Sequence, residues 1–202
     1  MMDASPVKRR RRNAALEQAI LGVAWAELLD HGYAGLTLAG VASRAGTSRT
    51  VLARRWAGKA DLAVAAVQYE LDQRPFGSPD LGNLRAELLD YLQRLGGLAD
   101  VIDLTFSMLL DASFRETYTS PQALRDVLMG GRQNVFATLM ARAARRGELN
   151  PARLTGTVVP LLNDLMGHYV LLHRTPPDPT LCAAWVDEIF LPLVGAVPNQ
   201  KV

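Results

Sequence analysis

Apolar residues recur three and four positions apart through most of this 202-residue sequence. That spacing places them on one face of an α-helix, whereas a half-buried strand needs strict alternation over about four to eight residues. No such alternation with β-branched residues occurs in the sequence. The pattern therefore predicts an all-α protein. With 49% hydrophobic residues and a single cysteine, Cys182, the chain is expected to bury a core without disulfide bonds.

Breaks in the helical period predict where the first helices end. The expected ranges are 13–31, 37–45, 48–56 and a fourth helix that begins at 59. Gly32 follows the first helix in the position where helices commonly stop. Thr37 is the expected N-cap of the second helix, and either Thr47 or Ser48 is the expected N-cap of the third.

The stretch 74–80 contains two prolines and a glycine, which predicts a linker. Beyond it, helices are expected at about 81–95, 100–117, 121–147, 151–173 and 179–195. Two of these ranges contain residues that disfavour a helix interior. Gly130 and Gly131 each cost about 1 kcal/mol relative to alanine, and Pro160 should kink or split its helix.

The second and third helices, joined by a tight turn with a glycine, predict a helix-turn-helix. The third helix has an apolar side, with Leu52 and Trp56, and an opposite polar side that carries Arg49 and Arg54. A helix that lies in the major groove needs this arrangement, because its apolar side packs on a scaffold while its guanidinium groups reach base edges. The alternative is a core helix whose arginines are merely solvated.

Positive charge is concentrated at the same end of the chain. Residues 1–60 carry a net charge of +6, and the remainder carries −4. A basic segment favours a polyanionic partner, because each neutralised phosphate releases counterions. Residues 1–12, with the cluster Lys8 to Arg12, are expected to form a flexible basic arm. This arm either enters a minor groove or attracts DNA without specificity.

A series of short motifs runs through residues 20–62: Gly32-Tyr33, Thr37, Ala42 to Gly46, Trp56 and Lys59. This segment resembles the DNA-binding domain of the tetracycline-repressor (TetR) family. The remainder is similar to the family's domain for ligand binding and dimerisation, through Arg146 to Pro151, Asp164 to Gly167 and Trp185 to Glu188. The resemblance implies a DNA-binding domain over residues 13–73, including a linking helix, and a second domain over residues 81–196.

The resemblance also implies roles for residues of the helix-turn-helix. Those expected to face base edges are Arg49, Thr50 and Arg54. Those expected to contact phosphates are Thr37, Ser48, Arg55 and Lys59. Ala53 stands where the family usually has a tyrosine, and the loss of a hydrogen bond to a charged group weakens binding by about 1.5–3 kcal/mol unless the arginines compensate. Alternatively, Ala53 contacts a thymine methyl group.

A homodimer and a small-molecule effector are further implications of the resemblance. Helices 151–173 and 179–195 of each subunit would form the interface, with Leu161, Leu165, Val186, Ile189, Phe190 and Leu193. A two-fold dimer implies a pseudo-palindromic operator in double-stranded DNA. The candidate effector-binding residues are Tyr91, Asp103, Met108, Asn134, Met140, Asn163 and His168.

The sequence thus predicts a cytoplasmic transcriptional regulator, in the simplest case a repressor released by an effector. It contains no catalytic motif of the hydrolase, phosphate-loop or metalloprotease kinds, so no enzyme activity, cofactor or metal site is expected. No apolar run approaches the roughly 18 residues that span a bilayer, so no membrane partner is expected. The alternative is a ligand- or protein-binding protein of the same fold that has lost specific operator binding, which Ala53 favours.

Overall fold

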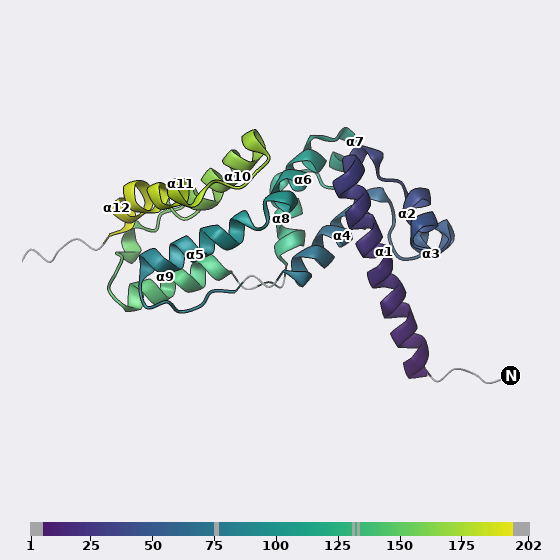
Figure 1. Ribbon diagram of the computed structural model, residues 1–202, viewed down its shortest axis with the longest axis horizontal. Coiled ribbons are helices and arrows are strands. Elements are labelled where there is room, and N and C mark those ends of the chain that lie inside the picture. The colour runs from purple at the N-terminus through teal and green to yellow at the C-terminus, as the bar shows by residue number, and fades with distance from the viewer. Residues whose placement is uncertain (1–5, 75–76, 131, 133, 196–202) are drawn as a thin grey trace, which may run out of the picture. The chain divides into compact units, whose positions relative to one another are not determined.

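The computed structural model describes residues 6–74, 77–130, 132 and 134–195, with side chains described from residue 13 onward. Within these ranges the regular structure is helical, apart from one isolated antiparallel bridge between Leu149 and Gly195. The chain forms two compact units, Met1–Pro75 with Leu104–Gly130 and Phe76–Asp103 with Gly131–Val202. The all-α prediction is confirmed (Figure 1).

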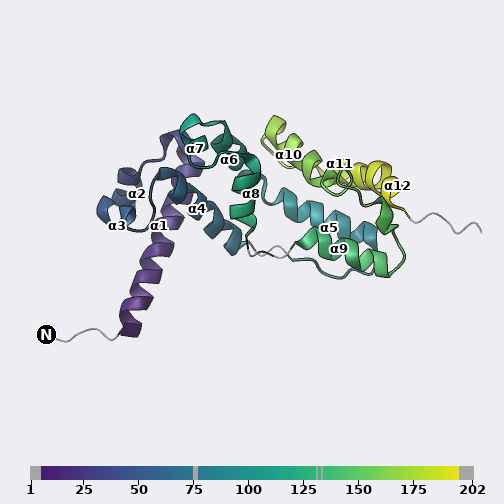
Figure 2. The same cartoon turned by 180° about the vertical axis from the view of Figure 1, so that it is seen from behind.

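The first unit begins with four helices: α1 (Pro6–Gly35), α2 (Leu38–Arg44), α3 (Arg49–Ala53) and α4 (Lys59–Gln73). α1 packs along α4, α2 packs on α1, and α3 packs on α2 (Figures 1 and 2). Ile20, Ala24 and Leu28 of α1 lie three or four positions apart and are all buried. The apolar face expected for the first helix is therefore the face that meets the core.

α1 is longer than the range 13–31 that the sequence predicts. It includes Pro6 to Arg12, although a flexible arm is expected over residues 1–12. The reason is local, since Lys and Arg favour a helix and Pro6 stands in the first turn, where proline is tolerated. At the other end, Gly32 has φ 65° and ψ 179°, which interrupts the helical backbone at the predicted stop.

Part of the chain after the linker also belongs to the first unit. It comprises the later part of α6 (Ala99–Leu110), α7 (Ala112–Arg115) and α8 (Pro121–Met129). Asp111 accepts hydrogen bonds from the backbone N–H groups of Ser113 and Phe114, so it caps α7 and splits the helix expected over 100–117. The first unit thus extends beyond the range 13–73, which stays a prediction for the DNA-binding domain.

Aromatic packing joins α7 to the end of α1. Phe114 is fully buried, and its ring meets the Tyr33 ring edge-on at a centroid distance of 5.1 Å. The Tyr118 ring stacks on Phe114 at 5.0 Å. α8 packs on α4, where the Gln68 side chain donates a hydrogen bond of 2.9 Å to the Val127 carbonyl. The segment 104–130 therefore completes the core of the first unit.

The second unit is built around α5 (Leu84–Gly96). Its other elements are α9 (Val135–Arg145), the one-turn η1 (Pro151–Arg153), α10 (Leu161–His173), α11 (Pro179–Ala184), the π-helical η2 (Trp185–Phe190) and α12 (Leu191–Val194). α5 contacts α9, α10, α11 and η2, and Figures 1 and 2 show α5 and α9 side by side. Leu88, Phe136, Met166 and Phe190 belong to the shared core.

Two long predicted helices are interrupted where the sequence carries glycine or proline. The range 121–147 becomes α8 and α9, with Gly130 as the C-cap of α8 and Asn134 as the N-cap of α9. The range 151–173 becomes η1 and α10, and Pro160 directly precedes α10. Proline lacks the N–H that a helix interior needs, so it stands at the helix start. By contrast, α11, η2 and α12 follow one another without a break.

A buried carboxylate fixes the linker onto the second unit. Glu87 is nearly inaccessible, and its oxygens lie 3.1 Å from Arg142 Nη2 and 3.0 Å from Arg146 Nη1. Arg142 also donates hydrogen bonds to the carbonyls of Ser78 and Pro79, at 3.1 and 2.8 Å. A buried charge needs such partners. Arg142, one of the two arginines that neutralise Glu87, also holds residues 78–79 in place.

Candidate nucleic-acid interface

Side-chain caps define the helix-turn-helix. The Thr37 hydroxyl accepts a hydrogen bond of 3.0 Å from the N–H of Gly40, and the Ser48 hydroxyl accepts one of 3.4 Å from the N–H of Val51. Ser48, rather than Thr47, is therefore the N-cap of α3. Between the two helices, Gly46 has φ 62°, a left-handed conformation that glycine adopts readily.

An ion pair fastens α2 to α1. The Arg44 guanidinium donates a short hydrogen bond to Glu27, a buried residue of α1, and lies 3.7 Å from Asp30. This pair orients the first helix of the helix-turn-helix on its scaffold. Arg44 therefore stabilises the packing of α2 on α1.

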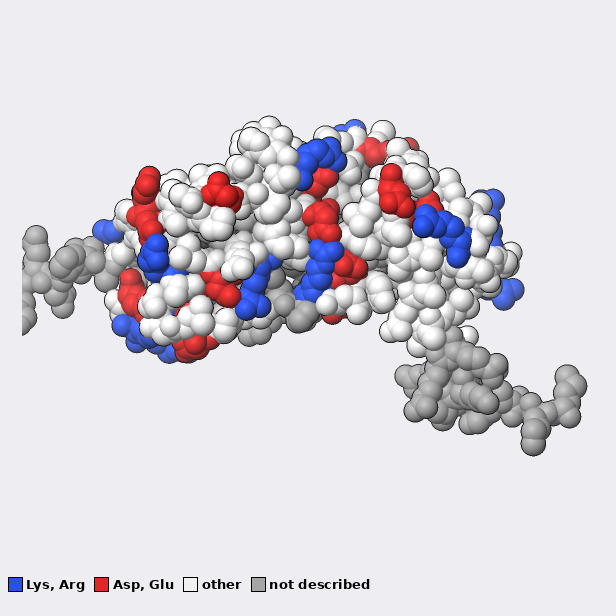
Figure 3. Space-filling model, in the orientation of Figure 1, with Lys and Arg blue, Asp and Glu red and all other residues white. Residues whose placement is uncertain are grey.

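α3 presents a buried side and an exposed side. Leu52 is fully buried. In α2, Val41 is fully buried and Ala42 is nearly so. The exposed residues of α3 and its two ends are Ser48, Arg49, Thr50, Ala53 and Arg54. The surface at the end that carries α2 and α3 shows Lys and Arg side chains (Figure 3). The division between apolar and polar sides agrees with the sequence-based prediction.

α3 ends at Ala53, three residues before the predicted end at Trp56. The N–H of Arg55 bonds to the Leu52 carbonyl at 2.9 Å, and the N–H of Trp56 bonds to the same carbonyl at 3.0 Å. The chain therefore tightens into a turn after Ala53. This turn places Trp56 in the core, where it is buried.

Arg55 pairs with an acidic residue of α1. Its Nη1 atom donates a hydrogen bond of 2.6 Å to Oε2 of Glu17. The side chains of Arg55 and Glu17 are 24% and 49% exposed. The two residues are 38 positions apart, and their pairing depends on how α1 packs against the helix-turn-helix. Sequence reasoning missed Glu17 because no local pattern marks such a contact.

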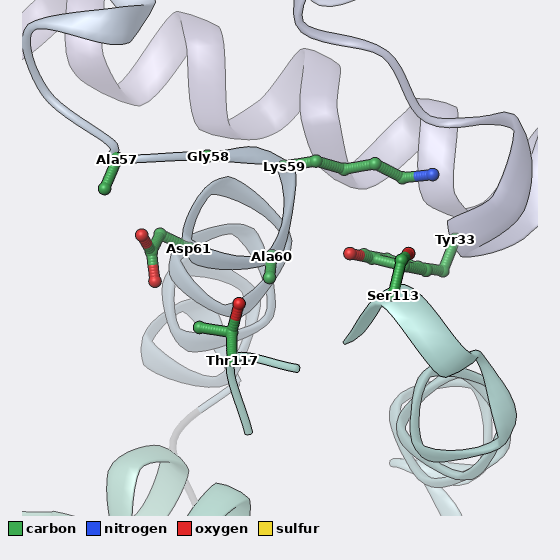
Figure 4. Close-up of a pocket in the computed structure, with 8 residues that line it drawn as sticks. All are labelled: Tyr33, Ala57, Gly58, Lys59, Ala60, Asp61, Ser113 and Thr117. Atoms are coloured by element: carbon green, nitrogen blue, oxygen red, sulfur yellow. The ribbon is translucent and has the colours of Figure 1, made fainter. Parts of the chain in front are cut away.

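Lys59 opens α4 and is held by the protein itself. Its Nζ atom donates a hydrogen bond of 3.0 Å to the Ala34 carbonyl and lies 4.3 Å from the centre of the Tyr33 ring. Figure 4 shows its side chain extended toward Tyr33 and Ser113. Burial lowers the pKa of Lys59, and the charge of Asp111 acts in the opposite direction.

A cavity of about 490 Å³ lies beside Lys59 in the first unit. It is lined by Tyr33, Ala57, Gly58, Lys59, Ala60, Asp61, Ser113 and Thr117 (Figure 4). The Tyr118 hydroxyl donates a hydrogen bond of 3.2 Å to Asp61. Burial, aided by the charge of Asp61, raises the pKa of Tyr118 to about 12, so this hydroxyl stays protonated. The candidate effector-binding residues do not line this cavity.

The candidate effector-binding residues do not gather at one place. Met108 belongs to the first unit, whereas Tyr91, Asp103, Asn134, Met140, Asn163 and His168 belong to the second. Within the second unit, the Tyr91 hydroxyl donates a hydrogen bond to the Asn163 side chain. Tyr91 and Met140 also belong to the same hydrophobic core.

The other four candidates of the second unit lie at separate places. Asn134 caps α9, and Asp103 forms an ion pair with Arg174 at 2.6 Å. Met140 is buried in the core, and His168 is exposed. Asn134, Asp103 and Met140 thus have structural roles, and His168 lies at the surface.

Two of the six predicted dimer-interface residues lie inside their own unit. Val186 and Phe190 are fully buried in the core of their own unit, so they have no surface to offer a partner. A helix with apolar residues on more than one side does not reveal from sequence which side meets its own core. The remaining candidates keep accessible surface: Leu161 and Leu165 are partly buried, and Ile189 and Leu193 are exposed.

A capped helix-turn-helix with a buried apolar side and an exposed side that carries arginines defines a class, the helix-turn-helix DNA-binding regulators. Residues 20–66 match the family model described as bacterial regulatory proteins, tetR family, and residues 78–189 match the one described as tetracyclin repressor-like, C-terminal domain. The chain belongs to the TetR family of regulators, and it is a DNA-binding transcriptional regulator. No helix of its described residues is long and apolar enough to span a membrane.

Similar proteins agree with this assignment. An uncharacterised HTH-type transcriptional regulator of Mycobacterium tuberculosis is 31% identical over 180 residues, which cover 87% of this chain and 86% of the relative. The DNA-binding transcriptional repressor TetR of Mycobacteroides abscessus is 26% identical, covering 91% and 96%. Among solved structures, the fatty acid degradation regulator FadR of Bacillus halodurans shares the fold, with a TM-score of 0.63, 16% identity and coverage of 91% and 97%.

Proposed function

We propose that this regulator binds a pseudo-palindromic operator in double-stranded DNA as a homodimer and represses transcription there. The exposed polar side of α3 carries the proposal, because Arg49, Thr50 and Arg54 are accessible while Leu52 anchors the opposite side. A side chain must be accessible to reach a base edge in the major groove, and arginine suits the paired acceptors of guanine.

Phosphate contacts are assigned to Thr37, Ser48, Arg55 and Lys59. Lys59 stands in the first turn of α4, where unpaired backbone N–H groups and the helix dipole also favour an anion. Binding a phosphate there requires the ammonium to leave the Ala34 carbonyl or to share its protons with both acceptors. Such contacts orient the protein on the duplex and carry no sequence information.

The homodimer is proposed to use accessible apolar residues of α10 and of the stretch from α11 to α12. Leu161 and Leu165 are partly exposed on α10, and Ile189 and Leu193 are exposed near the end of the described chain. Apolar side chains left accessible on neighbouring helices favour burial against a symmetric copy. A two-fold dimer then presents two copies of α3 to two half-sites.

Release by a small-molecule effector is the proposed control. The Tyr91–Asn163 pair supplies polar groups at the edge of the apolar core to which Tyr91 belongs, which supports a hydrophobic or aromatic ligand with a polar group. An effector shifts DNA binding only by its differential affinity for two conformations. The proposed activity is binding without a chemical step, in the cytoplasm where the bacterial chromosome lies.

Selection of duplexes from a random pool, at two salt concentrations and with competitor DNA, tests the proposal. Enrichment of an inverted repeat would support a dimeric, sequence-specific regulator and would supply the operator for effector screens. Binding that is salt-sensitive but enriches no motif would contradict it. That outcome would favour a ligand- or protein-binding protein of this fold that has lost specific operator binding, in agreement with Ala53 in place of the usual tyrosine.

A further inference from the structure

The two cations assigned to phosphates have different partners in the protein. Lys59 contacts a carbonyl and an aromatic ring, which carry no net charge. Arg55 instead forms an ion pair with the carboxylate of Glu17. Among the described residues, Glu17 is the one acid that forms an ion pair with a side chain assigned to DNA, since neither Arg49 nor Arg54 forms one.

The exposure of the pair determines what a nearby phosphate would meet. Arg55 is mostly covered, whereas half of the Glu17 side chain is accessible. A phosphate that approaches Arg55 therefore also approaches an accessible carboxylate. The attraction by the guanidinium is opposed by repulsion from Glu17 over a similar distance.

We propose that Glu17 limits the affinity of this regulator for DNA by competing with the phosphate backbone for Arg55. The inference rests on the proposed function, because it assumes that Arg55 contacts a phosphate. Glu17 acts through Arg55 and needs no contact with DNA. Because phosphate contacts supply most of the affinity for DNA of any sequence, Glu17 reduces the tendency of the protein to stay on non-operator DNA.

A purely structural role for Glu17 makes the opposite prediction. If the carboxylate served to hold Arg55 in the position that a phosphate requires, its removal would weaken DNA binding. If it competes with the phosphate, its removal strengthens binding. The sign of the change in affinity therefore distinguishes the two roles.

The test compares the full chain with Glu17→Gln in binding to a duplex of mixed sequence, a few helical turns long, over a range of salt concentrations. We expect the variant to bind about three- to tenfold more tightly at low salt. The slope of log affinity against log salt should become steeper by up to about 0.9, the value for one additional phosphate contact. Glutamine keeps the size of the side chain and can still accept a hydrogen bond from Arg55.

Further variants make the comparison specific. Glu70→Gln removes the same charge from a residue of the same unit that pairs with Arg74 at 2.7 Å, outside the proposed interface, and should change neither affinity nor slope. In an Arg55→Gln background, Glu17→Gln should give no gain. Thermal unfolding checks that each variant is folded, and Glu17→Ala serves as a second variant at the same position.

The possible outcomes separate this inference from the proposed function. Weaker or unchanged binding by Glu17→Gln would overturn the inference alone, provided that the unmodified protein binds the duplex. An equal gain by Glu70→Gln, or a gain that persists without Arg55, would overturn it as well, because net charge would then explain the effect. If the unmodified protein and all variants fail to bind any duplex, the proposed function is overturned and the inference falls with it.

Discussion

The Lys59 ammonium lies 4.3 Å from the centre of the Tyr33 ring, and this residue, which opens α4, is half-buried. Burial lowers its pKa from the ordinary value of 10.5. Because only the protonated ammonium pairs with a phosphate, affinity for DNA should fall as the pH rises through this lowered pKa. The loss should therefore begin at a lower pH than an exposed lysine would give.

Fluorescence anisotropy with a labelled duplex, from about pH 7.5 to about pH 10, measures this effect. Lys59→Arg is the matched control, since arginine stays protonated over the whole range. The control should keep its affinity where the unmodified protein loses it. Parallel curves for the two proteins would show that Lys59 is not the titrating group.

Substitutions of residues proposed to contact bases should affect DNA binding differently from substitutions of residues proposed to contact phosphates. Arg49→Ala or Arg54→Ala should cost about 1–3 kcal/mol on the operator and relax specificity at one base pair. Lys59→Ala should weaken binding to all sequences alike and reduce the salt slope by about one. Competition binding with operator and single-mismatch duplexes measures both. Identical effects from the arginine and lysine variants would mean that the reading and phosphate-contacting sides are wrongly assigned.

Ala53 offers a test by gain of function. It is exposed, so Ala53→Tyr should leave the fold intact and add a hydroxyl that can bond to the DNA backbone. We expect binding to strengthen by about 1.5–3 kcal/mol, the value of a hydrogen bond to a charged group. Ala53→Phe supplies the ring without the hydroxyl and should gain less. Weaker binding by both variants would instead support direct contact of Ala53 with a thymine methyl group.

Gly32 makes a prediction about stability. Its backbone, with φ 65° and ψ 179°, lies in a region that side chains with a Cβ atom rarely occupy. Gly32→Ala should therefore lower the free energy of unfolding by about 1–3 kcal/mol, measured by urea denaturation.

The control for Gly32 is Gly22→Ala in the interior of α1. A Cβ atom there has no neighbour within 4 Å, and alanine should stabilise the helix by about 0.5–1 kcal/mol. Equal effects at the two positions would contradict the role assigned to the Gly32 backbone.

Two neighbouring apolar residues should respond differently to substitution. Leu193 is 43% exposed, so Leu193→Glu should produce monomers that keep their thermal stability, as seen by light scattering and calorimetry. Phe190 is fully buried, so Phe190→Ala should cost about 3–5 kcal/mol of stability. A Leu193→Glu variant that remains dimeric would exclude this residue from the interface.

Local signals in the sequence predicted several caps and breaks of helices. Thr37 and Ser48 cap their helices, and Gly32 interrupts α1, because a cap or a positive φ depends on a few adjacent residues. Gly130 and Pro160 mark breaks for the same reason. The arginines on the exposed side of α3 follow from helical spacing alone.

Local sequence signals do not predict contacts between segments that are far apart in the chain. The Glu17–Arg55 ion pair and the packing of Phe114 on Tyr33 depend on how helices far apart in sequence come together. The same limit explains Phe190, whose apolar character is equally compatible with a subunit interface and with the core in which it lies. Periodicity identifies an apolar side but not its partner.

α6 begins in the second unit and ends in the first, so neither unit is a single continuous stretch of the chain. A hybrid regulator joined at the linker near residue 75 would inherit α1 to α4 but not the Phe114 ring that packs on Tyr33, nor the α8 helix that packs on α4. Exchange of the first unit between relatives requires its two segments, 1–75 and 104–130, to be exchanged together. A single crossover therefore cannot exchange the whole of the first unit.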